Sequence, residues 1–223
     1  MQEERRCRSS YFLTLTYENP PMSHNNFMTL NKRDVQLYFK RLRKLNPPGL
    51  KYYAVGEYGG KTRRPHYHAL VYNATLQSLQ EAWTLAGTSL GHIHTGTVEG
   101  ASIGYSLKYI SKPTIIPLHR NDDRVPEFAL MSKGLGSGYV NLKTQKWHLL
   151  DPENRMYLTL TDGRKVSMPR YYKDRIYTTE RQAINYFLAQ KELKDDGFTE
   201  SERAAAYLQA FNKMKKAAHK TKI

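Results

Sequence analysis

Residues 51–72 read KYYAVGEYGGKTRRPHYHALVY, and this stretch decides the architecture. Two runs rich in aromatic and β-branched residues, 51–58 and 66–72, flank a polar segment that contains glycine, which is the pattern of two strands joined by a hairpin loop. In the second run His66 and His68 flank Tyr67, and the alternation of a strand points both imidazoles to one face. We therefore expect a β-hairpin that carries a histidine pair on one surface.

The register of this hairpin adds a carboxylate to the pair. If the hairpin closes symmetrically about residues 59–64, Glu57 lies directly across from His66, with Cβ atoms about 5 Å apart. Two imidazoles and one carboxylate suit an octahedral divalent ion, Mg²⁺ or Mn²⁺, with positions left for water and a phosphate oxygen, and zinc also accepts such ligands. The single cysteine, Cys7, cannot build a thiolate site alone. The candidate metal ligands are Glu57, His66 and His68.

Two other patterns compete with this metal site. His92 and His94 form a second histidine pair in HIHTGTV, but no acidic residue has an equally simple register with them, so we interpret 92–98 as a surface strand. The segment GEYGGKT resembles a phosphate-binding P-loop, yet Val55 stands where that motif needs its first glycine, and the loop leads into a strand rather than a helix. ATP hydrolysis is therefore not supported.

The segments around the hairpin alternate between strand and helix patterns. A strand is predicted over 11–17, a helix follows the capping residue Asn31, and a second helix begins near Thr75. The strand at 92–98 leads to a third helix that begins near Ser102. The order predicts an α+β fold, an antiparallel sheet that carries helices in a ferredoxin-like or RRM-like core.

The domain organisation follows from length and composition. With 223 residues and 39% hydrophobic content, the chain suits one domain with appendages. We expect the core to occupy 1–125 and a C-terminal helical extension, packed on the core, to occupy 126–223. The extension contains a predicted hairpin over 155–168, with Asp-Gly as its turn, and a final amphipathic helix that begins with a capping-box pattern at Thr199 and Glu202.

The predicted third helix carries the candidate nucleophiles. In SIGYSLKYISK, 102–112, helical spacing places the apolar residues Ile103, Leu107 and Ile110 on one stripe. The pattern YxxK occurs twice outside that stripe, so the candidates are two phenols and two ammonium groups: Tyr105, Tyr109, Lys108 and Lys112. A phenol with a pKa of about 10 is mostly protonated at pH 7, and both a nearby ammonium and a metal-bound phosphate help it to attack. Packing or base-stacking tyrosines are the alternative, since the chain has 17 tyrosines.

The charge balance indicates a polyanionic partner. A net charge of +15 attracts nucleic acid, and the candidate DNA contacts are Thr14, Thr16, Arg63, Arg64 and Lys133. No apolar run approaches the roughly 20 residues that span a bilayer, so we expect no membrane insertion. The polar start MQEERRCRSS does not resemble a secretion leader, so the expected location is the cytoplasm.

Three ordered motifs carry a resemblance to a known family. The segments are FLTLTY at 12–17, GEYG with RPHYHALVY at 56–72, and YSLKYISK at 105–112. They resemble the motifs of the HUH endonuclease superfamily and, more closely, those of the replication initiators of gokushovirus-type microviruses, which are single-stranded DNA bacteriophages. The similarity continues through EFALMSKGLGSGY and PRYYKDRIY, and so covers most of the chain.

The resemblance implies a function and a role for each motif residue. It implies a rolling-circle replication initiator that cuts the single-stranded viral origin with a tyrosine, keeps a 5′-phosphotyrosine link and later rejoins the strand, with a host polymerase and helicase as partners in the bacterial cytoplasm. Glu57, His66 and His68 would hold the metal, Tyr105 and Tyr109 would attack, and Lys108 and Lys112 would assist. Two alternatives stay open: a tyrosine transposase or relaxase with the same chemistry, and a noncatalytic single-strand-binding module.

Overall fold

The computed structural model describes residues 2–111, 116–152, 154–160 and 162–177, with the backbone alone for 108–111. The chain divides into two compact units, Met1–Tyr139 and Val140–Ile223. The first unit carries the predicted hairpin and all its surrounding elements. Each unit is described separately below.

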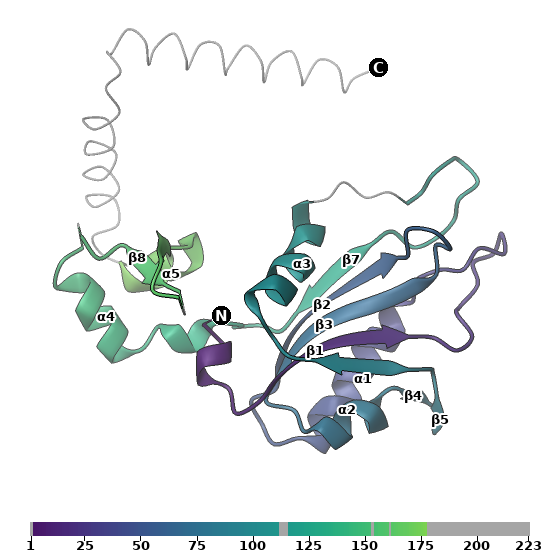
Figure 1. Cartoon of the computed structure of the whole chain (residues 1–223), viewed down its shortest axis with the longest axis horizontal. Coiled ribbons are helices and arrows are strands. Elements are labelled where there is room, and N and C mark those ends of the chain that lie inside the picture. Colours follow the sequence, from purple (N-terminus) through teal and green to yellow (C-terminus); the bar gives the residue numbers. More distant parts are fainter. Residues whose placement is uncertain (1, 112–115, 153, 161, 178–223) are drawn as a thin grey trace, which may run out of the picture. The chain divides into compact units, whose positions relative to one another are not determined.

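In the described part of the first unit, an antiparallel sheet has the strand order β6-β1-β3-β2-β7 (Figure 1). The hairpin forms as expected, because β2 pairs with β3 across the predicted loop. The strands of the sheet are β1 (Ser10–Thr16), β2 (Lys51–Tyr58), β3 (Pro65–Tyr72), β6 (Ile93–Gly96) and β7 (Phe128–Met131). The helices are α1 (Lys32–Leu45), α2 (Leu76–Ala82) and α3 (Gly100–Ser111), with short 3₁₀ turns at Glu4–Arg6 and Ser137–Tyr139.

The topology confirms the predicted fold class. Strands β1, β2, β3 and β6 are the four strands of a βαββαβ unit, with α1 between β1 and β2, and α2 between β3 and β6. Numbered in chain order within that unit, they lie side by side as 4-1-3-2, which is the ferredoxin-like arrangement. The chain therefore has an α+β core of the expected kind.

The main hydrophobic core lies between the sheet and the pair α1 and α2 (Figure 1). Helix α1 begins where the Asn31 side chain accepts a hydrogen bond from the Arg33 backbone N–H, as the capping pattern predicts. Alternate strand residues and one face of each helix fill this layer with fully buried side chains: Leu13, Leu15, Val35, Tyr38, Phe39, Leu42, Tyr67, Ala69, Val71, Leu79 and Trp83. This packing fixes which strand residues are left for the opposite face.

The opposite face of the sheet carries a smaller apolar cluster. Its buried members are Tyr53, Val55, Leu70, Tyr72 and Val98, and Ile103 of α3 packs against them. Helix α3 thus lies on the side of the sheet away from α1 and α2 (Figure 1). Glu57, His66 and His68 have the same strand parity as this cluster, so they share its face.

The strand β7 was not predicted, and it changes the expected domain boundary. Residues 128–131 pair with β2, from Gly56 opposite Phe128 to Tyr53 opposite Met131. Four residues with alternating exposure give too short a pattern to identify a strand at the edge of a sheet. The unit that holds the sheet therefore extends to Tyr139, past the boundary expected after residue 125. A second small hairpin, β4 (Thr84–Leu85) with β5 (Thr88–Ser89), was also not predicted.

The second unit contains α4 (Leu142–Leu149), the hairpin β8 (Tyr157–Thr159) with β9 (Lys165–Ser167), and α5 (Arg170–Ile176). The hairpin confirms the prediction from its Asp-Gly pair: Gly163 has a φ of +83°, a conformation that favours glycine. His148, Leu158 and Tyr172 are buried in this unit. The predicted last helix, with Thr199 and Glu202, lies outside the described residues. No helix among those the structure describes has the length and apolar character needed to cross a membrane.

Candidate metal centre

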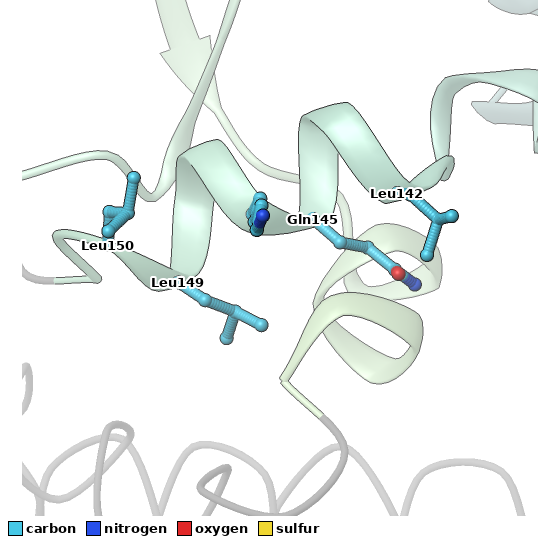
Figure 2. Close-up of a pocket in the computed structure, with 5 residues that line it drawn as sticks. Leu142, Gln145, Leu149 and Leu150 are labelled. Atoms are coloured by element: carbon cyan, nitrogen blue, oxygen red, sulfur yellow. The ribbon is translucent and has the colours of Figure 1, made fainter.

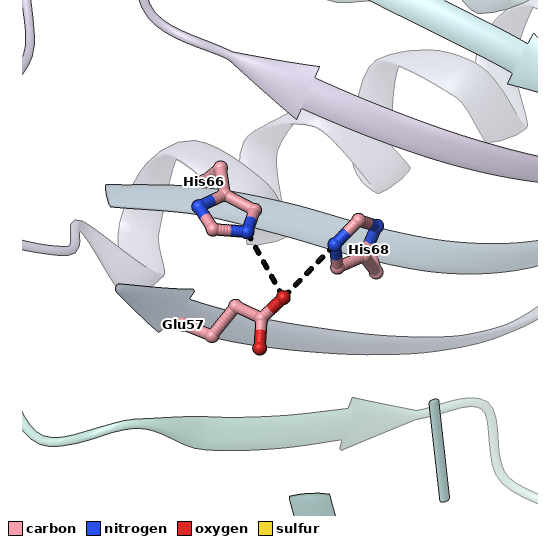
Figure 3. A group of neighbouring side chains, drawn as sticks. All are labelled: Glu57, His66 and His68. Carbon is pink, nitrogen blue, oxygen red and sulfur yellow. Dashed lines mark hydrogen bonds and ion pairs between the residues drawn. The ribbon is translucent and has the colours of Figure 1, made fainter. Parts of the chain in front are cut away.

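Two adjacent strands bring the three predicted ligands together. Glu57 on β2 is directly opposite His66 on β3, as the symmetric hairpin predicts, and His68 is two residues further along β3. Glu57 Oε1 lies 2.9 Å from Nε2 of His66 and 2.9 Å from Nε2 of His68 (Figure 3). Within the described residues this is the one group of three or more histidine, cysteine or acidic side chains with metal-site spacing.

The electrostatics of the group show why a cation fits there. Glu57 is only 3% exposed, and a buried carboxylate needs a positive partner or a metal. The largest influence on His66 is burial, which acts to lower its pKa. The hydrogen bond to Glu57, the hydrogen bond to the Arg64 carbonyl and the charge of Glu57 together outweigh burial, so the pKa of His66 lies above its ordinary value. In the metal-free protein, a proton on His66 thus balances the carboxylate, and a divalent cation can take that place.

The donor set agrees with a divalent metal. Two imidazole nitrogens and a carboxylate oxygen lie within 4.8 Å of one another, which fits Mg²⁺, Mn²⁺ or Zn²⁺ without choosing among them. The other ring nitrogen of each histidine also has a partner: Nδ1 of His66 lies 3.2 Å from the Arg64 carbonyl, and Nδ1 of His68 lies 3.0 Å from Thr14 Oγ1. Such outer contacts are typical of metal-ligating histidines.

A candidate nucleophile reaches the same carboxylate. The Tyr105 hydroxyl, from α3, donates a hydrogen bond to Glu57 Oε1 at 3.1 Å, and its ring stands edge-on to the His68 ring at 5.1 Å. Tyr105 is nevertheless 43% exposed, so a substrate can approach it. One carboxylate oxygen therefore has two imidazoles and a phenol as neighbours.

Helix α3 is oriented differently from the predicted apolar stripe. Leu107 was expected to be buried but is 46% exposed, whereas Ser106 is fully buried. The Ser106 hydroxyl donates to the Ser102 carbonyl one turn earlier, so a small side chain can face the sheet without an unpaired polar group. This orientation lets the Tyr105 phenol lie over Glu57. Lys108 and Tyr109 are on α3, but their side chains lie outside the described residues, as does all of Lys112.

The predicted DNA contacts are spread over several elements. Thr14 and Thr16 are on β1, where the Thr16 hydroxyl donates to the His92 carbonyl at 3.2 Å. Arg63 is in the hairpin loop with a φ of +52°. The Arg64 guanidinium donates to the carbonyls of Tyr17 and Glu18, and so it fastens the loop to the end of β1. Lys133 is exposed, and its carbonyl accepts from Lys51. Their contact with DNA stays a prediction.

The competing sites are absent from this face or lack the right chemistry. His92 and His94 are exposed at β6, which agrees with the surface-strand interpretation. In the second unit, α4 carries an apolar hollow lined by Leu142, Gln145, Lys146, Leu149 and Leu150 (Figure 2). Its lining contains no metal-ligating side chain, so the hollow is not a second candidate centre.

Comparisons with known proteins now bear on this geometry. Residues 10–114 match a family model of replication-associated proteins of the ORF2 type. This segment is a domain of that replication-associated family. It contains the whole hairpin, β1 and the candidate nucleophiles of α3, so the resemblance to phage replication initiators is confirmed.

Two curated relatives align beyond the replication-associated domain. Replication-associated protein VP4 of Bdellovibrio phage phiMH2K is 27% identical, over 77% of this chain and 59% of its own length. Replication-associated protein ORF2 of Spiroplasma virus 4 is 26% identical, over 76% of this chain and 58% of its own length. The chain therefore spans a little under three fifths of each relative. No solved structure matches the chain.

Proposed function

We propose that this protein is a rolling-circle replication initiator that nicks and rejoins single-stranded DNA through a tyrosine, with help from a divalent metal. The observation that carries the proposal is the position of the Tyr105 hydroxyl, 3.1 Å from the Glu57 oxygen that also contacts both histidines. The names of the two relatives, both replication-associated proteins, support the replication role. A binding module would have no need for a phenol beside a ligand set.

The arrangement supports attack on phosphorus by the phenol oxygen. Protonation of a phenol at pH 7 costs its nucleophilic form roughly 4 kcal/mol, so activation is needed. A divalent cation held by Glu57, His66 and His68 would draw charge from a phosphate oxygen and stabilise the transition state. The Glu57 carboxylate orients the phenol by accepting its hydrogen bond, and the 43% exposure of Tyr105 leaves room for DNA.

The reaction conserves the phosphoester. A bond forms between the Tyr105 oxygen and phosphorus while the bond from phosphorus to the 3′ oxygen breaks, and the released oxygen takes up a proton to become a 3′ hydroxyl. The reverse reaction, by a 3′ hydroxyl on the phosphotyrosine, rejoins a strand without ATP. Tyr109 lies one turn further along α3, so we assign it a second transfer, with Lys108 and Lys112 as assisting cations. The substrate would be a viral origin in the bacterial cytoplasm, with host polymerase and helicase as partners.

Covalent capture tests the proposal. The protein is incubated with a circular single-stranded phage genome and Mn²⁺, denatured, and analysed for protein attached to a DNA 5′ end. We expect an adduct from the wild type and none in EDTA. Either Tyr105→Phe or Tyr109→Phe alone should reduce the adduct, and the double change should remove it. Tyr157→Phe, in the second unit, is the matched control and should leave the yield unchanged.

The metal ligands have their own test. The double variant His66→Ala and His68→Ala should keep its affinity for single-stranded DNA, measured by fluorescence anisotropy, and form no adduct. An undiminished adduct in the double tyrosine variant would exclude the proposed nucleophiles. Full metal-dependent cleavage by the double histidine variant would exclude the proposed ligands.

A further inference from the structure

The first sequence motif, FLTLTY, has no role in the chemistry above, but one of its hydroxyls contacts a candidate ligand. Thr14 Oγ1 lies 3.0 Å from Nδ1 of His68. We infer that Thr14 is a positioning residue of the metal centre, one that holds His68 with Nε2 toward the metal. This inference rests on the metal site of the proposed function and assigns to Thr14 a role other than the DNA contact expected from the sequence.

The sheet itself sets up this contact. Strand β1 pairs with β3 so that Thr14 is directly opposite His68, and directly opposite residues in an antiparallel pair have side chains on the same face. His68 is 9% exposed, so few water molecules can replace the threonine. Without the hydroxyl, Nδ1 would be a buried polar atom that has lost its partner, which is costly enough to turn the ring.

A hydroxyl suits this position because it can both donate and accept. In the metal-free protein, Nε2 of His68 faces Glu57, and Thr14 can donate its hydrogen to an unprotonated Nδ1. When Nε2 binds a cation, the single proton of a neutral imidazole moves to Nδ1, and Thr14 can then accept it. The Arg64 carbonyl beside His66 can only accept, so the two ligands are held by different means.

Neighbouring rings restrict the remaining freedom of His68. The Phe12 ring, also from β1, stacks on the imidazole with centroids 5.4 Å apart and an interplanar angle of 10°. The Tyr105 ring is perpendicular to it at 5.1 Å. These contacts fix the plane of the imidazole, but they do not distinguish its two nitrogens. Thr14 makes that distinction, which decides whether Nε2 or Nδ1 faces Glu57.

Metal affinity in the absence of DNA is the test. Mn²⁺ binding to the full chain is measured by calorimetry for the wild type, Thr14→Val, Thr14→Ser and Thr16→Val. Valine keeps the shape of threonine without the hydroxyl, and we expect it to weaken binding about 10-fold to 100-fold, the usual effect of an outer-shell change. Serine should restore wild-type affinity. Thr16→Val is the matched control, since the Thr16 hydroxyl contacts a backbone carbonyl instead of a ligand.

A second readout follows the imidazole directly. Long-range ¹H–¹⁵N spectra of the Mg²⁺-loaded protein should show His68 protonated at Nδ1 in the wild type and in Thr14→Ser, and a mixture of tautomers in Thr14→Val. Thermal unfolding in EDTA checks that each variant is folded, and Thr14→Ala replaces valine if valine prevents folding. DNA affinity in EDTA should be equal for the wild type and Thr14→Val.

The outcomes separate this inference from the proposed function. Wild-type Mn²⁺ affinity in Thr14→Val, or failure of the wild type to bind metal, would overturn it. A loss of DNA affinity with unchanged metal affinity would make Thr14 a DNA contact and also overturn it. If instead the wild type forms no covalent adduct while Thr14→Val still weakens Mn²⁺ binding, the positioning role stands and the nicking proposal fails.

Discussion

A single carboxylate oxygen organises the centre at the scale of residues. Glu57 Oε1 contacts the two Nε2 atoms and accepts the hydrogen bond of the Tyr105 phenol. Burial of this carboxylate is unfavourable unless cationic groups surround it, so the residue has little value to the fold by itself. Its negative charge is best explained by a bound cation.

Removal of that charge should separate metal binding from folding. We expect Glu57→Gln, which keeps the size and hydrogen-bonding capacity of the side chain, to weaken Mn²⁺ binding by at least about tenfold. A ligand that binds only the folded state raises the melting temperature, so the rise caused by Mn²⁺ should be largely lost in the variant. Calorimetric melting with and without Mn²⁺ measures it. Glu81→Gln, an exposed carboxylate on α2, is the control; an equal Mn²⁺ response in Glu57→Gln would contradict the ligand role.

His148 offers a pH-dependent prediction in the second unit. The ring is fully buried, and its Nδ1 donates to the Arg155 carbonyl at 2.6 Å. Burial lowers the pKa of His148, so the folded state favours the neutral ring. Its contribution to stability is complete above the unfolded-state pKa of about 6.5 and is lost as the pH falls through the lowered folded-state pKa.

Urea unfolding at pH 7.5 and pH 5.5 tests this, followed by the fluorescence of Trp147, which packs against the His148 ring. We expect the wild type to lose stability at the lower pH. His148→Asn can still donate to the Arg155 carbonyl but does not titrate, so it should lose less. Equal pH dependence of the two proteins would show that another group is responsible.

At the scale of elements, the alternation of β2 and β3 made the centre predictable. The period of two in HYHALVY fixed the common face of the histidines, and a symmetric hairpin fixed Glu57 opposite His66. The orientation of α3 was not predictable in the same way, because its buried face includes Ser106, whose polarity hides it from a hydrophobic pattern. The contact between Thr14 and His68 depends on the pairing of β1 with β3, which joins residues 54 positions apart.

Glycine at position 91 should be essential for the pairing of β6 with β1. Its φ of +149° and the close approach of the Thr16 to Glu18 backbone leave no space for a Cβ atom. It lies between two ladder contacts, from Thr16 N–H to the His92 carbonyl and from Glu18 N–H to the Leu90 carbonyl. We expect Gly91→Ala to destabilise the protein by roughly 1–3 kcal/mol, measured by urea unfolding.

The control for this change is Gly60→Ala in the hairpin loop. A Cβ at Gly60 would have no neighbour within 4 Å, so the effect should be within about 0.5 kcal/mol. A similar loss of stability in both variants would mean that backbone flexibility, rather than the close approach at β1, explains the result.

At the scale of the whole molecule, charge dominates over any single contact. A net charge of +15 on 223 residues predicts that DNA affinity depends strongly on salt. The logarithm of the binding constant should fall linearly with the logarithm of salt concentration, with a slope of roughly −0.7 for each phosphate contact on a single strand. Anisotropy titrations of labelled single-stranded DNA across NaCl concentrations measure this slope. Thr14→Val should give the same slope as the wild type, and a salt-independent affinity would contradict an electrostatic mode of binding.

The side chain between the two histidines connects the chemistry to the interior. Tyr67 points to the helical side of the sheet, where its hydroxyl accepts from the Asn31 backbone N–H at 2.8 Å and lies 2.9 Å from the Tyr17 hydroxyl, which donates to Asp34. A shift of β3 that moved either imidazole would also pull Tyr67 away from the first turn of α1. Occupancy of the catalytic surface is thereby mechanically coupled to a helix on the reverse of the sheet, and slower deuterium uptake at the Asn31 amide would report it.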